Sequence, residues 1–116
     1  MTSFIAFLGT GKGTWGHVSR LMNEKWDNIF LVGNNFARKF THEKKFEFIE
    51  IDEKSSVDVI KTIIVGSLKG KINDTEVALN IVSGDGREHS ALISSVMEAG
   101  YGFRLILLTK DGMKTL

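Results

Sequence analysis

The sequence predicts an α/β fold, a three-layer, doubly wound, Rossmann-like parallel sheet of five or six strands with the strand order 3-2-1-4-5. Short apolar runs alternate along the chain with segments in which apolar residues recur every three or four positions. This alternation is typical of a parallel sheet whose two faces are covered by helices. Right-handed crossovers restrict the possible topologies further. Glycine-rich turns also follow the first and the fourth apolar run, at residues 9–13 and 83–87.

The first half of the chain contains three predicted strands and two predicted helices. The uninterrupted apolar run at Ser3–Leu8 predicts a buried strand. A helix is predicted over residues 14–25, where one face carries Trp15, Val18, Leu21 and Met22. A second strand, a short helix and a strand with alternating polarity are predicted at residues 28–32, 35–43 and 46–51.

The second half continues the alternation. A helix is predicted over residues 55–68, because Ser55 and Asp58 fit a capping box. Its buried stripe is predicted at Val57, Ile60, Ile64 and Leu68. A strand at residues 77–82, a helix at 87–99 and a largely apolar strand at 103–108 complete the pattern. The last helix is expected to turn Leu92, Val96 and Ala99 inward.

Composition limits the classes of protein. A chain of 116 residues with 42% hydrophobic and 25% charged residues is expected to form a single domain spanning 1–116. The net charge of +1 does not favour duplex nucleic acid as a partner. The absence of cysteine excludes disulfides and thiolate metal sites, and no apolar run approaches the ~20 residues of a membrane span. We therefore expect a cytoplasmic protein with no membrane partner.

The predicted strand order brings two turns together. In a 3-2-1-4-5 sheet the first and fourth strands are neighbours, and the chain reverses its direction of winding between them. Ligands bind beyond the carboxyl ends of the strands at such a switch point. The first glycine turn (residues 9–13) and the second glycine turn (residues 83–87) are therefore expected to line one crevice.

Both turns have the composition of a phosphate-binding loop. Each opens a predicted helix, whose N-terminus offers backbone N–H groups and a partial positive charge. Glycines allow close approach of the backbone to a phosphate. Thr10 and Ser83 add hydroxyls, and Lys12 and Arg87 add positive charges. The structural alternative is that the glycines are turn residues and that Asp85 with Glu88 forms a plain capping box.

Known nucleotide motifs match poorly. The Walker pattern is absent. Gly11-x-Gly13-x-x-Gly16 matches the dinucleotide fingerprint, but Gly33, Asn34 and Asn35 stand where the ribose-binding acid is expected.

Three further residues each allow more than one interpretation. Asn34 either binds a ribose or base edge or caps the next helix, and the cap is slightly favoured. Trp15 is either a core residue or a stacking platform for a base. His89 lies near the start of its helix, where it either reaches the crevice or has no role in the site. The histidines show no metal-ligand spacing, so no metal site is predicted.

Two passages of the sequence carry a family resemblance. "VALNIVSGDGREHSALISSVMEAGYGFRLILLT" resembles the fourth-strand region of CRISPR-associated Rossmann fold (CARF) domains. Their strand ends in Asn and is followed by a Thr/Ser-Gly-Gly-Thr-Lys/Arg-like turn. Asp85 and Gly86 depart from that pattern, which is matched at Asn80, Ser83, Gly84 and Arg87. "FEFIEIDEKSSVDVIKTII" looks like the third strand and the helix that follows it in the same family.

The resemblance implies a function. CARF domains bind cyclic oligoadenylates, the second messengers of type III CRISPR antiviral defence, usually in a cleft of a homodimer. A standalone domain of this type resembles either a sensor or a ring nuclease, which needs no metal or other cofactor. Cleavage proceeds by attack of a ribose 2′-hydroxyl on its own phosphate and leaves 2′,3′-cyclic phosphate ends.

The resemblance also implies site residues. Thr10 and Arg87 match positions where ring nucleases place a catalytic hydroxyl and a cation, and Lys12 and Ser83 are the next candidates. The ligand-binding set comprises Gly9, Gly11, Gly13, Trp15, Asn34, Ser83, Gly84, Asp85, Gly86 and His89. The alternatives are a non-catalytic, nucleotide-responsive interaction module and, third, a small dinucleotide-binding enzyme or a fragment of one.

Overall fold

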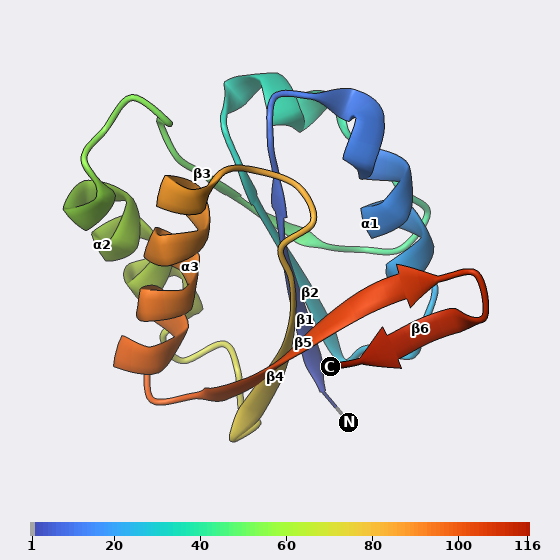
Figure 1. Cartoon of the computed structure of the whole chain (residues 1–116). Helices are drawn as coiled ribbons and strands as arrows, with labels where there is room; N and C mark the ends of the chain where they lie inside the picture. The colour runs from blue at the N-terminus through green and yellow to red at the C-terminus, as the bar shows by residue number, and fades with distance from the viewer. Residues whose placement is uncertain (1) are drawn as a thin grey trace.

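The computed structural model describes residues 2–116, apart from the side chain of Lys12. Its centre is a six-stranded sheet in the order β3-β2-β1-β4-β5-β6 (Figure 1). The first five strands pair in parallel, and β6 is antiparallel to β5. The predicted order 3-2-1-4-5 is therefore confirmed. The strands are β1 (Ser3–Leu8), β2 (Asn28–Gly33), β3 (Glu47–Glu50), β4 (Glu76–Asn80), β5 (Gly102–Thr109) and β6 (Gly112–Thr115).

Helices cover both faces of the sheet. In Figure 1, α2 and α3 lie against one face, and α1 lies against the other. The α-helices are α1 (Trp15–Leu21), α2 (Val57–Leu68) and α3 (Gly86–Glu98), and the 3-10 helices are η1 (Lys12–Thr14) and η2 (Asn35–Lys39). Within residues 2–116, no helix has the length and apolar character needed to cross a bilayer.

The central strand β1 shows why the layers form. All of its residues are buried, which is expected of a strand with helices on both sides. Alternate side chains enter opposite halves of the core. Ile5 and Phe7 join the cluster under α2 and α3, whereas Phe4, Ala6 and Leu8 join the cluster under α1.

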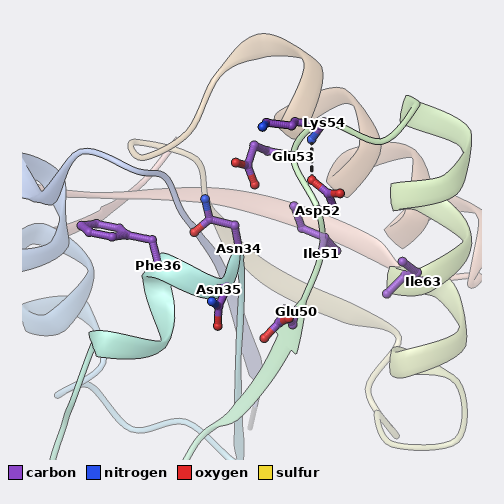
Figure 2. Close-up of a pocket in the computed structure, with 9 residues that line it drawn as sticks. All are labelled: Asn34, Asn35, Phe36, Glu50, Ile51, Asp52, Glu53, Lys54 and Ile63. Carbon is purple, nitrogen blue, oxygen red and sulfur yellow. Dashed lines mark hydrogen bonds between the residues drawn. The ribbon is translucent and has the colours of Figure 1, made fainter.

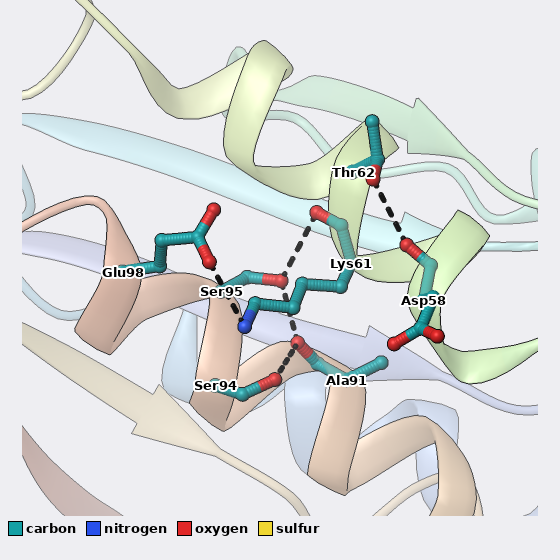
Figure 3. Close-up of polar contacts among 7 residues, drawn as sticks. All are labelled: Asp58, Lys61, Thr62, Ala91, Ser94, Ser95 and Glu98. Carbon is teal, nitrogen blue, oxygen red and sulfur yellow. Dashed lines mark hydrogen bonds and ion pairs between the residues drawn. The ribbon is translucent and has the colours of Figure 1, made fainter.

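Polar contacts join α2 to α3 (Figure 3). The buried hydroxyl of Ser95 donates to the carbonyl oxygens of Ala91 and Lys61. The ammonium group of Lys61 also pairs with the Glu98 carboxylate at 3.0 Å. These contacts hold α2 and α3 together on one face of the sheet.

The start of α2 differs from the prediction by one serine. The N-cap is Ser56, whose hydroxyl oxygen accepts from the backbone N–H of Val59. Ser55 is not the cap, because its own N–H donates to the carbonyl of Asp52 in the preceding turn. Ile60, Ile64 and Leu68 are buried as predicted.

Two predicted helices are shorter in the structure. The helix expected over residues 14–25 ends at Leu21, whose carbonyl accepts from the Trp26 indole and from the backbone of Glu24. The helix expected over residues 35–43 is the 3-10 helix η2, and Phe40 after it is already extended. The β5–β6 hairpin was within the predicted strand number, but its position was not identified from the sequence.

Candidate functional site

The two glycine turns meet at one edge of the sheet. β1 and β4 pair from Ser3↔Val77 to Ala6↔Asn80, so their carboxyl ends lie side by side. The N–H of Gly9 donates to the Ser83 hydroxyl oxygen at 2.8 Å, across 74 positions of sequence. A Cβ on Gly9 would lie 2.8 Å from the backbone nitrogen of Gly84. The first and second glycine turns therefore form one continuous surface.

That surface is hollowed into a cleft of about 460 Å³, here named the hinge cleft. Residues from both turns and from the start of α3 line it, namely Gly9, Thr10, Gly11, Gly13, Thr14, Val82, Ser83, Gly84, Asp85 and Glu88. Most of these were ligand-binding or catalytic candidates in the sequence. Thr14, Val82 and Glu88 were not, although Glu88 carried a signal as the third residue after the capping Asp85.

The first glycine turn is held at its base and open at its tip. The Gly9 carbonyl accepts from the Trp15 indole N–H at 3.0 Å, and Gly9 is buried. Thr10, Gly11 and Gly13 are exposed. A Cβ on Gly11 or Gly13 would meet no atom within 4 Å, so these glycines leave open space in the cleft. The side chain of Lys12, a predicted catalytic cation, lies outside the described residues.

The second glycine turn is tied down by its own side chains. Asp85 caps α3 by accepting from the Glu88 N–H, and Glu88 accepts in return from the Asp85 N–H, each at 2.9 Å. The capping box of Asp85 and Glu88 is thus present, as the sequence suggested. The His89 Nε2 atom lies 2.7 Å from the Ser83 carbonyl oxygen, so the imidazole ring contacts the backbone of this turn. Gly84 has φ +99°, a conformation that side chains rarely tolerate.

The wall of the hinge cleft formed by the second glycine turn and the start of α3 is negatively charged. Glu88 is only 8% exposed, and burial raises the pKa of its carboxyl group above the ordinary value. The charges of Asp85 and Glu53 raise that pKa further, whereas the hydrogen bond from the Asp85 backbone and the charge of His89 lower it. Because the carboxyl groups of Asp85 and Glu88 stand at the start of α3, this end of the helix is not a simple anion-binding N-terminus.

Arg87 points to a neighbouring loop. Its guanidinium donates to the carbonyl oxygens of Glu53 at 3.1 Å and Ser55 at 2.6 Å. The side chain is exposed and does not line the hinge cleft, and neither does Gly86. The catalytic role suggested for Arg87 stays a prediction, because a ligand contact would require the guanidinium to leave these carbonyls.

Trp15 and Asn34 have structural tasks. Trp15 is 8% exposed and packs against Phe36 and Phe40, with ring centroids 5.7 and 6.0 Å away. Its position corresponds to the core alternative. The Asn34 side chain accepts from the Ala37 N–H at the start of η2, which is the cap favoured from the sequence.

A second cavity of about 560 Å³ opens beyond the ends of β2 and β3 (Figure 2). Figure 2 shows Glu50 at the end of β3 and Asp52 and Glu53 in the loop after it, on the opposite side of the cavity from Phe36. Its polar groups are largely used internally, because Glu50 pairs with Arg38 and Asp52 accepts from the Lys54 N–H. The hinge cleft is smaller, but it is the one at the switch point of the sheet.

The end of β4 is fixed by a buried polar network that the sequence did not reveal. Asn80 is fully buried and donates to the Ile106 carbonyl at 2.8 Å. The His17 Nε2 atom accepts from the Leu108 N–H at 3.0 Å, and burial lowers the pKa of His17. Within residues 2–116, no cluster of histidine and carboxylate side chains is arranged to hold a metal ion.

No protein-family model matches this sequence, and no curated protein shows a significant match to it. The geometry of the hinge cleft is therefore the basis for assigning a function. Exposed glycine backbone and hydroxyls on one wall suit a phosphate group. Carboxylates on the other wall suit hydroxyl or amine donors. A ligand that carries a phosphate group together with hydroxyl or amine donors, such as a nucleotide, matches the two walls together.

Proposed function

We propose that this chain binds a cyclic oligoadenylate in the hinge cleft, acting as a homodimeric, CARF-like sensor domain. The observation that carries the proposal is the backbone contact between the two glycine turns. Gly9 and Gly84 approach so closely that a Cβ on Gly9 does not fit, and the Ser83 hydroxyl links the two turns by accepting from the Gly9 N–H. Segments distant in sequence thereby form one glycine-lined cleft at the switch point of a Rossmann-like sheet.

The lining supports a phosphate-bearing ribonucleotide. Thr10 and Thr14 bring hydroxyl groups to the cleft, and the exposed backbone of Gly11 and Gly13 allows a phosphate to approach the chain closely. Carboxylates accept hydrogen bonds from ribose hydroxyls and from the adenine amine.

A homodimer fits this class of ligand for a reason of symmetry. A ring of identical nucleotides with a two-fold axis matches an isologous interface, in which the same surface of each subunit contacts the ligand. Each protomer would then contribute one hinge cleft to the ring. Sedimentation with and without cyclic tetra-adenylate measures whether one ring is held by two chains.

A melting experiment tests the binding. Purified protein is heated with cyclic tetra-adenylate, cyclic hexa-adenylate, NAD or ATP. A ligand at 100 times its Kd stabilises the folded state by about 2.7 kcal/mol. For a domain of this size that corresponds to an upward shift of the melting temperature of roughly 10 °C. We expect this shift with one of the cyclic ligands, and a shift with NAD alone would favour the dinucleotide-enzyme alternative.

Two matched pairs of variants locate the binding. Gly11→Leu fills open space in the hinge cleft and is expected to abolish the shift, whereas Gly66→Leu adds the same side chain to the exposed side of α2 and should preserve it. Arg87→Ala should reduce the shift if the guanidinium turns to the ligand. Arg104→Ala is its control, because Arg104 is exposed and pairs with Glu76 at the opposite end of β4.

Product analysis separates a sensor from a ring nuclease. After incubation without added metal, linear oligoadenylates with 2′,3′-cyclic phosphate ends would identify a ring nuclease, and an intact ring would identify a sensor. Cleavage requires the 2′-hydroxyl to lie in line with the bond that breaks and requires stabilisation of charge on the phosphorane. Thr10→Ala tests whether the hydroxyl that lines the cleft contributes to that step.

A further inference from the structure

The hinge cleft contains carboxylates where a phosphate site would be expected to contain only donors. Asp85 and Glu88 both line it, at the N-terminus of α3. A negative charge there repels a phosphate and occupies the backbone N–H groups that would otherwise bind it. Asp85 also departs from the turn of the family that the sequence resembles.

Hydrogen bonds hold both carboxylates in position in the turn. Each accepts a backbone N–H of the other at 2.9 Å. A Cβ on Gly84 would lie 3.2 Å from the Glu88 Oε1 atom, so the carboxylate is packed directly against the turn. The Glu88 side chain is also largely buried.

Apart from Lys12, whose side chain is not described, the basic side chains next to this turn are directed elsewhere. Among the described side chains that line the hinge cleft there is no lysine or arginine. Arg87 is adjacent in sequence, but its guanidinium donates to the carbonyls of Glu53 and Ser55. His89 is turned to the Ser83 carbonyl. The second wall of the cleft is consequently acidic with no cation of its own.

An acidic wall repels different phosphate groups to different extents, because they carry different charges. A phosphodiester carries one negative charge, and a terminal phosphomonoester carries up to two near neutral pH. A ribose hydroxyl beside a diester can in addition donate to a carboxylate. Accepting the proposed nucleotide site, we propose that Asp85 and Glu88 determine specificity by selecting phosphodiesters and rejecting terminal phosphomonoesters.

A matched pair of dinucleotides tests the selection. Adenylyl-(3′→5′)-adenosine has one phosphodiester, and its 5′-phosphorylated form differs only by a terminal phosphate. Cyclic tetra-adenylate serves as the positive control for binding. Isothermal titration at pH 7.5 is expected to show that the 5′-phosphate weakens binding about tenfold, because it adds up to two negative charges a few ångströms from a carboxylate in a partly solvated site.

Two isosteric variants assign the effect to the carboxylates. Glu88→Gln and Asp85→Asn remove one charge each and keep a side-chain oxygen for the cap. Each is expected to reduce the tenfold preference to about threefold or less, because one of two repelling charges is gone. Glu98→Gln is the control, because it removes the same charge at the other end of α3, where Glu98 pairs with Lys61 (Figure 3).

The outcomes separate this inference from the proposed function. If the wild-type protein binds neither cyclic tetra-adenylate nor either dinucleotide, the nucleotide site itself is wrong. If it binds both dinucleotides equally, or if both variants keep the full preference, the specificity role is overturned and the nucleotide site remains. Circular dichroism checks folding, and Asp85→Asn, at an exposed position, carries the test if Glu88→Gln unfolds.

Discussion

The first and second glycine turns have a common sequence pattern and different hydrogen bonding. The first runs into the short helix η1, and Thr14, which precedes α1, makes no side-chain capping bond. The second is closed by a reciprocal capping box and opens the 13-residue helix α3. One turn is open at its tip, and the other is occupied by its own side chains.

The difference assigns separate tasks to the two walls of the hinge cleft. An uncapped turn keeps backbone donors for an external acceptor, whereas a capped one has used them. A phosphate is therefore expected against Thr10, Gly11 and Gly13, and a donor such as a ribose hydroxyl is expected against Asp85 and Glu88. Similar glycine patterns thus place two loops at one site without making them equivalent.

The largest effect is expected where the turns touch. In Gly9→Ala the new Cβ would lie 2.8 Å from the Gly84 nitrogen and 3.0 Å from its Cα, both backbone atoms that cannot rotate away. We expect the free energy of unfolding to fall by about 3 kcal/mol. Chemical denaturation measures it. Gly11→Ala, in the open part of the first turn, should change stability by less than about 0.5 kcal/mol, and equal effects of the two variants would contradict this geometry.

The hydrogen bond between the turns is expected to contribute next. Ser83→Ala leaves the buried Gly9 N–H without its acceptor, since Ser83 is only 2% exposed and excludes water. The expected loss is about 2 kcal/mol in the free energy of unfolding. Ser90→Ala is the control, because its exposed hydroxyl donates only to the Gly86 carbonyl within α3. A Ser83→Ala protein as stable as the control would show that the turns are held by packing alone.

The capping box of the second turn is expected to have a smaller effect. Asp85→Ala removes the acceptor for the Glu88 N–H, and loss of an N-cap costs about 1 kcal/mol. Asp85→Asn should restore most of that stability, because asparagine caps helices nearly as well. Thermal unfolding of both variants measures the difference. If asparagine fails to restore it, the negative charge at the start of α3 matters more than the hydrogen bond.

The large-scale arrangement could be predicted because it depends on repeated signals. Apolar runs and helical spacings are averaged over many residues, and the crossover rule then limits the strand order. The meeting of the two glycine turns follows from that order without any knowledge of side chains. The capping of α3 by Asp85 was also readable, since the pattern is local.

Single side-chain directions could not be predicted in the same way. The hydrogen bonds from the Arg87 guanidinium to the carbonyls of Glu53 and Ser55 were not predicted, because that loop lies near Arg87 through the packing of α2 on α3. Ser55 and Ser56 are adjacent and either could cap α2, but the hydrogen-bonded turn from Asp52 to Ser55 leaves Ser56 as the N-cap. Such choices depend on a few contacts between distant segments, for which no periodic signal exists.

The smallest effect expected here is a pH dependence located at Glu88. Burial raises the pKa of its carboxyl group above the ordinary value of 4.5, so the folded state holds this proton at a pH where the unfolded state has lost it. Stability therefore falls as pH rises from about 4.5 through the folded-state pKa. Glu88→Gln cannot ionise and lacks this dependence.

The measurement is the difference in unfolding free energy between wild type and Glu88→Gln, followed from pH 4 upward. The wild type is expected to lose stability relative to Glu88→Gln as the pH rises through the folded-state pKa of Glu88. Above that pH the difference is expected to stay constant. His17, whose pKa is lowered from 6.5 by burial, makes both proteins more stable as pH rises, and its contribution cancels in the difference. A difference that stays flat would mean that the second glycine turn is as open to water as the first.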